Sequence, residues 1–334
     1  MVEAGFLVQG HQRPVGMLMQ AIRNDRLHHA MLFVGPNGIG KRVVALGVAR
    51  LLNCVDPRPE GPCNACRPCT RIDARQHPDV ILVEPDTSKA RWTIKIDQVR
   101  QVTQQVRYRP YEGKRRVVVI DHAEALTVEA ANAFLKTLEE PTGDTNFILL
   151  TAQPHMLLDT IRSRCQLMRF APLERQLVLK LLLEREIAPE VAEVASGYCE
   201  GSLATALELC EEDALTDRRA FIEGVLDLRD ADTLALLDLA QSQARRDNQE
   251  LQTDLDALKV FYRDVVILRS GASQERLVNT DLAARTRTLA SRVTVESAIR
   301  CIEAIDTTQS GLRRYIDARL LMEQLLLKLV DAQA

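Results

Sequence analysis

The stretch from Ala30 to Asn53 is the part of the sequence that most constrains the fold. The apolar run Ala30–Gly35 (AMLFVG) predicts a short buried strand, and the turn after it, GPNGIGK, has three glycines before Lys41. From Arg42 to Asn53, apolar residues recur at helical spacing. A strand, a glycine-rich loop and a helix in this order begin an α/β unit that is built around a parallel sheet.

The loop fits a phosphate-binding motif in its glycines and lysine, but not in the residue after the lysine. In such a loop, backbone N–H groups and the amino end of the helix bind phosphate oxygens, and the lysine adds positive charge. The next residue is normally Ser or Thr, whose hydroxyl ligates Mg²⁺, whereas Arg42 has only donors. The loop therefore predicts the fold but leaves ATP binding doubtful. The candidate nucleotide-binding residues here are Gly35, Asn37, Gly38, Gly40 and Lys41.

A second position of the expected nucleotide site is also altered. The run RRVVVID predicts a strand over Arg115–Asp121, and Asp121 at its end could hold Mg²⁺ through water. An ATPase of this type carries an acidic residue next, which activates the attacking water, and here that residue is His122. Two catalytic positions are changed in the same direction, so we expect a chain that hydrolyses ATP poorly or not at all.

The rest of the first 171 residues alternates between strands and helices. Short apolar runs bounded by turn residues predict strands, and helical spacing of apolar residues predicts helices. Thr127 can cap the strongest of these helices, and Pro141 ends it. Strands separated by helices imply a parallel sheet covered on both faces. The further strands are expected at Asp79–Glu84, Asn146–Thr151 and Gln166–Phe170, and the helices at Ile96–Val106 and Thr127–Glu139.

The chain changes character after Pro172, where the strand signals stop. The predicted architecture is α/β: a P-loop domain with a parallel sheet at 1–171, a small helical lid domain at 172–212 and an all-helical C-terminal domain at 213–334. Short helices are expected at Leu173–Arg185, Pro189–Ser196 and Ser202–Cys210, and long amphipathic helices are clearest at Asn248–Arg269 and Leu312–Val330.

Composition places the chain among ordinary globular proteins. With 46% hydrophobic and 27% charged residues it can bury real cores, and disorder is excluded for most of the chain. A net charge of −3 argues against a protein that coats nucleic acid. No apolar stretch reaches the ~20 residues that span a membrane, and the amino end lacks the pattern of a signal peptide. We therefore expect a soluble, cytoplasmic protein without a membrane partner.

The cysteines are unevenly distributed, with four of the eight inside the turn-rich segment 54–69. Their spacing, C-x8-C-x2-C-x2-C, lets two tight turns and a helix end hold one ion, and four thiolates are a usual donor set for structural Zn²⁺. A redox pair, a disulfide and an iron–sulfur cluster remain alternatives, of which the disulfide is disfavoured in a reducing cytoplasm. We expect one structural zinc ion, with the ligands Cys54, Cys63, Cys66 and Cys69.

Five segments occur in an order and spacing that are recognisable. They are His28-His29-Ala30, the loop GPNGIGK, the cysteine cluster, Asn132–Pro141 (NAFLKTLEEP) and Ser163-Arg164-Cys165. The chain resembles the bacterial clamp-loader subunits of DNA polymerase III, members of the AAA+ superfamily, most specifically over residues 10–170. The resemblance implies a zinc module at 54–69 and a hetero-oligomeric ring with other subunits (gamma/tau and delta). Such a ring loads a sliding clamp onto primed DNA.

Two kinds of subunit in this family differ at the nucleotide site. The motor kind, gamma/tau, hydrolyses ATP, whereas the delta-prime kind is often degenerate there. Arg42 and His122 favour the delta-prime kind, as does Gly201–Ala204, because motor subunits have an arginine after Gly-Ser-Leu where this chain has Ala204. The resemblance therefore implies a non-hydrolysing subunit, with a motor subunit that has its own ATPase activity as the alternative. Any polymerase activity would belong to the holoenzyme.

The triplet Ser163-Arg164-Cys165 is the site to which the resemblance assigns a catalytic role in trans. In similar subunits its arginine faces the ATP of a neighbour. A guanidinium suits that role because it stays charged and donates several hydrogen bonds to phosphate oxygens. Taken alone, Arg164 would be read as a surface ion-pair partner. Arg162 is expected to be structural, and Cys165 to be a small buried residue rather than a nucleophile.

Two further groups of side chains are each open to two interpretations. A basic run before the third strand could contact DNA phosphates or lie in a solvated loop. The apolar residues of the last helix could join subunits in a collar, form an internal core, or do both. The basic residues are Arg107, Arg109, Lys114, Arg115 and Arg116, and the leucines are Leu320, Leu321, Leu325, Leu326 and Leu329.

Overall fold

The computed structural model describes residues 5–86, 92–140, 144–211, 214–228, 233–273, 277–314 and 316–333. The chain divides into two compact units. The first comprises Met1–Leu177 with Gly201–Ala204, and the second comprises Val178–Glu200 with Thr205–Ala334. The boundaries of the lid and C-terminal domains, expected at 172–212 and 213–334, stay predictions. No helix among the described residues is long and apolar enough to cross a membrane.

A five-stranded parallel sheet in the order β2-β3-β4-β1-β5 forms the centre of the first unit. All five strands predicted from apolar runs are present, with their ends shifted by a residue or two. Because parallel strands end at one edge of a sheet, the residues that follow β1, β2 and β3 are brought together there. The strands are β1 (Ala30–Val34), β2 (Val80–Val83), β3 (Arg116–Ile120), β4 (Thr145–Thr151) and β5 (Gln166–Arg169).

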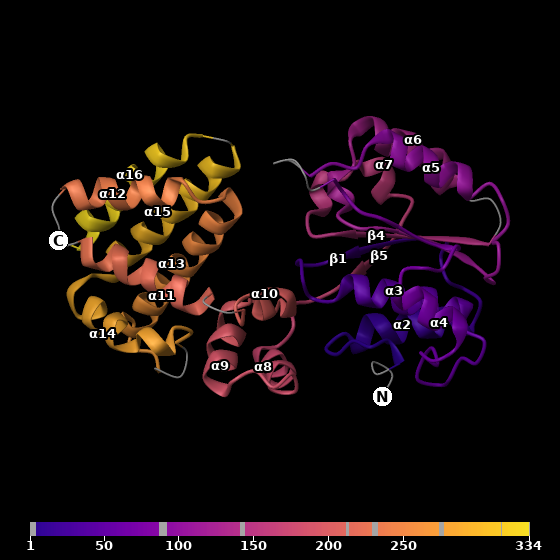
Figure 1. Ribbon diagram of the computed structural model, residues 1–334, viewed down its shortest axis with the longest axis horizontal. Coiled ribbons are helices and arrows are strands. Elements are labelled where there is room, and N and C mark those ends of the chain that lie inside the picture. The colour runs from indigo at the N-terminus through magenta and orange to yellow at the C-terminus, as the bar shows by residue number, and fades with distance from the viewer. Residues whose placement is uncertain are drawn as a thin grey trace. The chain divides into compact units, whose positions relative to one another are not determined.

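Helices cover both faces of this sheet (Figure 1). Alternate strand residues point to opposite faces, so Met31 and Phe33 join one core cluster while Ala30 and Leu32 join the other. The predicted α/β fold, with a parallel sheet covered on both faces, is therefore confirmed. One face carries α2 (Gln12–Arg23), α3 (Lys41–Asn53) and α4 (Arg67–Asp73), and the other carries α5 (Ile96–Gln105), α6 (Val128–Glu139) and α7 (Asp159–Arg162).

Local signals explain where these helices begin. The side chain of Thr127 accepts a hydrogen bond from the backbone N–H of Ala130, as its position as the cap of α6 predicts. Pro141, which was expected to end this helix, lies outside the described residues. Helix α4 was not anticipated, since it lies partly in the turn-rich cysteine segment. It begins at Arg67 with Pro68 in its first turn, where proline is tolerated because that N–H needs no intrahelical partner.

The second unit is helical, and α8 begins in the first unit. Its core contains a buried polar network in which Arg218 lies over the Tyr198 ring at 4.7 Å and donates to Asn279. Short helices predicted near 173–185, 189–196 and 202–210 are confirmed with adjusted ends. The helices are α8 (Arg175–Leu183), α9 (Pro189–Tyr198), α10 (Leu203–Glu208), α11 (Ala214–Asp227), α12 (Thr233–Ala244), α13 (Asn248–Arg269), α14 (Ala283–Arg292), α15 (Val295–Arg313) and α16 (Ala318–Gln333).

The prediction of one helix over Leu312–Val330 is wrong. The structure ends α15 at Arg313 and begins α16 at Ala318. Backbone hydrogen bonds close the end of α15, where the Gly311 carbonyl accepts from the N–H groups of Arg314 and Ile316. A Cβ at Gly311 would lie 2.8 Å from the Leu321 side chain, so the glycine also lets α16 pack closely on α15.

The leucines of α16 mainly serve the core of the second unit. Four of the five are buried, whereas Leu320 has an exposed fraction of 61%. An internal core therefore accounts for most of this apolar surface. The buried residues are Leu321, Leu325, Leu326 and Leu329.

Candidate functional sites

The phosphate loop joins β1 to α3 at the carboxyl edge of the sheet. Gly38 and Gly40 have positive φ angles of 73° and 103°, a conformation that favours glycine. A Cβ at Gly38 would lie 2.1 Å from the Ser202 hydroxyl oxygen and 2.8 Å from the Cβ of Ala204. The loop is therefore packed tightly against the segment 201–204.

Position 204 is close to this loop. The backbone N–H of Ala204 donates to the carbonyl of Gly38 at 3.2 Å. An arginine at this position would start its side chain beside the phosphate cradle, whereas alanine supplies only a methyl group. Motor subunits have an arginine at this position. The positive charge that this chain lacks would therefore lie next to the phosphate loop.

Lys41 is folded onto the loop. Its Nζ donates to the carbonyl oxygens of Gly35 and Pro36, each at 2.6 Å, and the residue is buried. Burial lowers the pKa of Lys41 to about 8, although the negative charges of Asp121 and Glu124 oppose the shift. Lys41 therefore keeps the position of a phosphate-binding lysine, at a reduced basicity.

Arg42 lies where a divalent cation would be needed. Its Nη1 is 2.6 Å from the Glu84 Oε1 and 3.4 Å from the Asp121 Oδ2, so one guanidinium joins the residues that follow β2 and β3. The carboxylate expected to hold Mg²⁺ through water is already paired, and Arg42 has no oxygen to offer the ion. The residues at this edge do not fit a magnesium site.

Glu84 was missed in the sequence, although a signal for it exists. It directly follows β2, and β2 pairs with β3 in parallel, so Glu84 and Asp121 end neighbouring strands. Arg75 also approaches Glu84, at 3.5 Å. Two arginines therefore surround a carboxylate that the sequence analysis treated only as the end of a strand.

His122 and Glu124 form a second pair that sequence reasoning did not find. The His122 Nδ1 lies 3.4 Å from the Glu124 Oε1, and the Trp92 ring meets the imidazole edge-on. The hydrogen bond with Glu124 raises the pKa of His122 despite partial burial. For Glu124, burial acts to raise the pKa, but hydrogen bonds from His122 and Thr151 outweigh it, and the pKa is lowered. The nearby acid is therefore engaged, and the position after Asp121 carries an imidazole.

Arg164 lies in the turn between α7 and β5, held by groups of its own chain. Its Nε donates to the Glu139 Oε1 at 2.7 Å, and its Nη2 bonds the same oxygen. Its Nη1 donates to the Thr160 carbonyl at 2.7 Å and to the Ser163 hydroxyl at 3.5 Å. The side chain is 33% exposed. Glu139 was not singled out in the sequence, since 25 residues separate it from Arg164.

The neighbours of Arg164 have contacts within their own chain, and Cys165, which was expected to be buried, is partly buried. Arg162 pairs with Asp159 at 3.0 Å within α7, as a structural arginine would. Cys165 packs against the core cluster of the α5–α6 face, and burial raises the pKa of its thiol to about 11. A thiol with a raised pKa is a poor nucleophile at neutral pH. Ser163 donates to the Thr160 carbonyl at 3.2 Å.

The four clustered cysteines converge. The sulfur atoms of Cys54, Cys63, Cys66 and Cys69 all lie within 4.8 Å of one another, so they could hold a metal ion. Backbone N–H groups point at two of these sulfurs: Cys63 N–H donates to the Cys54 Sγ at 3.4 Å, and Cys66 N–H to the Cys63 Sγ at 3.3 Å. Backbone hydrogen bonds lower the pKa of Cys63 to about 6, whereas burial raises the pKa values of Cys54 and Cys69.

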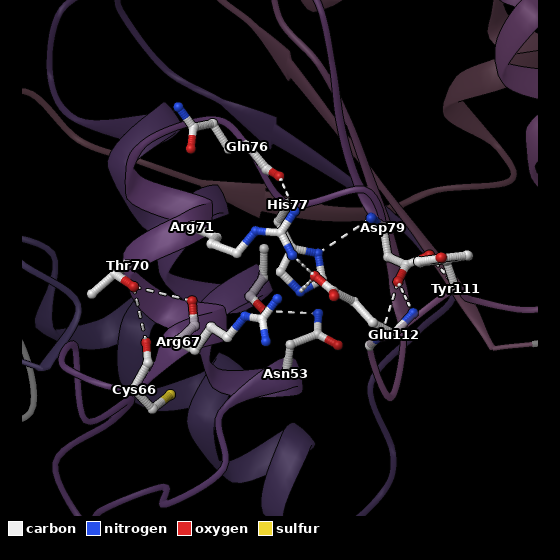
Figure 2. Close-up of polar contacts among 12 residues, drawn as sticks. Asn53, Cys66, Arg67, Thr70, Arg71, Gln76, His77, Asp79, Tyr111 and Glu112 are labelled. Atoms are coloured by element: carbon white, nitrogen blue, oxygen red, sulfur yellow. Dashed lines mark hydrogen bonds and ion pairs between the residues drawn. The ribbon is translucent and has the colours of Figure 1, made fainter.

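A buried carboxylate, Asp79, binds the loop that carries the basic run. Asp79 accepts hydrogen bonds from the backbone N–H groups of Tyr111, Glu112 and Gly113, and its contact with Tyr111 is drawn in Figure 2. These hydrogen bonds and the Arg116 ion pair outweigh the effect of burial and keep the pKa of Asp79 below its ordinary value. The loop 107–115 is thus wrapped around one negative charge.

Most of the basic run is used inside the chain. Arg116 pairs with Asp79 at 3.2 Å, Arg115 with Asp25 at 3.0 Å, and Lys114 donates to the Cys54 carbonyl at 3.0 Å. These three cations hold the loop, β3 and the cysteine segment together. Contact with DNA phosphates is therefore not needed to explain them.

Comparisons with known proteins agree with this geometry. A family model described as "DNA polymerase III, delta subunit" matches residues 10–174, and one described as "DNA polymerase III, delta subunit, C terminal" matches residues 212–331. The chain is 33% identical to DNA polymerase III subunit delta' of Bacillus subtilis, over 96% of each chain. It is 31% identical to subunit delta' of Escherichia coli, over 83% of this chain and 80% of that one.

Among solved structures, a gamma subunit-related protein of DNA polymerase III from Thermotoga maritima aligns over 95% of this chain and 99% of its own, with a TM-score of 0.50. At 20% identity this likeness supports the fold alone. The family follows from the near full-length match to subunit delta' of Bacillus subtilis. The chain belongs to the family of DNA polymerase III delta' subunits.

Proposed function

We propose that this chain is a ring subunit of a clamp loader that does not hydrolyse ATP itself and that offers Arg164 to the ATP of a neighbouring subunit. The observation that carries the proposal is the ion pair of Arg42 with Glu84 and Asp121. It supports a nucleotide site in which a side chain occupies the role of the divalent cation. Ala204 and His122 support the same conclusion, because both replace groups that a motor subunit would use.

The role of Arg164 is supported by its accessibility and its chemistry. Phosphoryl transfer spreads negative charge over the γ-phosphate oxygens, and an arginine supplied in trans can accelerate it by ~10³–10⁵ in GTPases. Arg164 is partly exposed on a short turn that the buried Ile161 anchors. Its guanidinium is partly exposed beside Glu139, so a triphosphate could bond it without displacing that carboxylate.

The partners follow from the family and from the resemblance in sequence. The neighbours of the chain would be gamma/tau and delta subunits in a hetero-oligomeric ring, which would load a sliding clamp onto primed DNA in the cytoplasm. ATP hydrolysis would then depend on ring assembly, because the motor site and its arginine lie on different subunits.

The metal at the cysteine cluster is proposed to be structural zinc. Four sulfur donors suit Zn²⁺, and a closed set of four thiolates leaves no position for a catalytic water. The ion would tie the end of α3 to the start of α4, which places it at the far end of the helix that begins with Lys41 and Arg42.

Reconstitution of the loader with Arg164→Ala tests the proposed function. Under single-turnover conditions with clamp and primed DNA, we expect the phase of ATP hydrolysis at the site facing this chain to disappear, while ring assembly is unchanged. Wild-type rate and amplitude would refute the role of Arg164. The alternative, a motor subunit, keeps some support from the retained Lys41 and glycines. It requires the purified chain to bind and turn over labelled Mg-ATP.

A further inference from the structure

Glu139 and Arg164 form a contact that the motifs alone do not reveal. Glu139 is the last residue of α6, and Arg164 follows α7. Both Nε and Nη2 of the guanidinium bond the same carboxylate oxygen. The approach along this edge fixes the plane of the guanidinium, because two N–H groups converge on one acceptor.

The other nitrogen of Arg164 is held as well. Nη1 donates to the Thr160 carbonyl and to the Ser163 hydroxyl, so the described contacts account for four of the five N–H groups and leave one on Nη2. The backbone is fixed on either side of the residue, since Ile161 is buried in the core and β5 pairs with β1. The side chain therefore has one defined orientation.

The position of Glu139 is not explained by the stability of its own helix. The carboxyl end of a helix carries partial negative charge, so cations are favoured there and a carboxylate is not. Glu139 nevertheless ends α6, and Glu140 follows it. The Arg162–Asp159 pair, by contrast, is local, since its partners are three positions apart in one helix. A long-range acidic partner for Arg164 at an unfavourable helix end points to a requirement of Arg164 itself.

We propose that Glu139 is the positioning residue for Arg164: it holds the guanidinium in the orientation in which its remaining N–H group meets the neighbour's triphosphate. This inference rests on the proposed function of Arg164. Holding the side chain before ATP arrives means that less conformational freedom is lost in the transition state. Among the described residues the Glu139 carboxylate bonds Arg164, so its effect is expected on the rate of hydrolysis and not on the binding of ATP.

The test compares Glu139→Ala and Glu139→Gln in the reconstituted loader with Asp159→Asn as the matched control. The measured quantity is the single-turnover phase that Arg164→Ala removes. We expect Glu139→Ala to slow this phase roughly three- to tenfold, with the ATP concentration for half-saturation unchanged. Glu139→Gln keeps an acceptor oxygen and is expected to give an intermediate rate. Asp159→Asn releases Arg162 in the same way and is expected to leave the phase unchanged.

A second measurement uses the isolated chain. The Nε–Hε group of Arg164, observed by ¹⁵N NMR, is expected to exchange slowly with water in the wild type and in Glu139→Gln, and rapidly in Glu139→Ala. If Arg164→Ala removes the phase while Glu139→Ala hydrolyses at the wild-type rate or faster, the positioning role is wrong and the proposed function stands. If Arg164→Ala itself has no effect, the proposed function fails first. Unchanged melting temperatures separate either result from misfolding.

Discussion

Arg42 and Arg164 are two arginines of one chain that face opposite tasks, and the contacts of each explain why. Arg42 sits between two carboxylates that end neighbouring strands, Glu84 and Asp121. Arg164 has a single carboxylate partner, Glu139, whose side chain is 46% exposed. The first cation is shared between two carboxylates at the sheet edge, whereas the second is paired with one carboxylate and keeps one N–H group without a contact among the described residues.

This difference shows that a charged residue is made useful or inert by the number and rigidity of its partners. Both arginines are fully charged at any physiological pH, so protonation does not distinguish them. Arg42 satisfies two acids that would otherwise attract a cation from solution. Arg164 is paired with one exposed acid, which leaves part of its guanidinium accessible to a triphosphate. Two of the four predictions below, Arg164→Lys and Arg42→Thr, test this contrast, and the other two concern the cysteine cluster and His122.

The largest effect is expected from Arg164→Lys, which keeps the charge but loses the planar fork of donors. Hydrolysis at the site facing this chain should fall by ~10² or more, because a lysine cannot keep the contacts of the planar guanidinium to Glu139 while it donates to a phosphate oxygen. Arg42→Lys serves as the control and should leave that rate unchanged. Single-turnover hydrolysis by the reconstituted loader measures both. Equal losses in the two variants would show that the arginines do not differ in role.

Removal of the metal comes next in size. Cys69→Ser leaves three thiolates, and we expect a loss of several kcal/mol in the free energy of unfolding, since structural zinc contributes directly to folding. The bound metal, measured by mass spectrometry, should fall from about one equivalent per chain to well below one. Cys210→Ser is the matched control, because Cys210 belongs to the second unit and is not one of the four clustered cysteines.

The contrast between the arginines predicts that the cation site can be restored. In Arg42→Thr a hydroxyl replaces the guanidinium, so Glu84 and Asp121 lose their internal cation and Mg²⁺ gains an oxygen ligand. Magnesium-dependent binding of labelled ATP should increase roughly tenfold, the size of one modest ligand contribution. Arg42→Ala removes the guanidinium without adding the hydroxyl and should bind more weakly than Arg42→Thr. An increase that does not depend on Mg²⁺ would contradict the role given to Arg42.

Sequence reasoning succeeded where the signal was local. The five strands are continuous apolar runs, the glycines of the phosphate loop lie within the motif GPNGIGK, and Thr127 is the cap residue at the start of α6. The cysteine cluster was also local, since its ligands lie within sixteen residues. In each case the residues that specify the feature are close together in the chain, so their spacing in the sequence is enough to predict the local structure.

It failed where the deciding contact joins distant residues. The pairs Arg42–Glu84 and Arg164–Glu139 span 42 and 25 residues, and charge alone cannot say which acid meets which base. The basic run was open to two interpretations, a contact with DNA phosphates or a solvated loop, and neither anticipated Asp79, the buried partner of Arg116 that lies far ahead of it in the chain. The break between α15 and α16 lies close to Gly311 in the sequence. Only the structure shows that this glycine makes room for the side chain of Leu321.

The smallest effect concerns pH and the pair His122–Glu124, which fills the place of a catalytic acid. Interaction with Glu124 raises the pKa of His122, so the protonated form is favoured in the folded chain. The stabilisation is present in full below the ordinary histidine pKa of about 6.5 and is lost as pH rises through the raised value. His122→Gln should remove this dependence and cost a few tenths of a kcal/mol at pH 6, the range of a partly exposed pair. Urea unfolding at pH 6 and pH 8 measures it. If the free energies of unfolding of the wild type and the variant differ by the same amount at both pH values, His122 is neutral in the folded chain and the prediction is wrong.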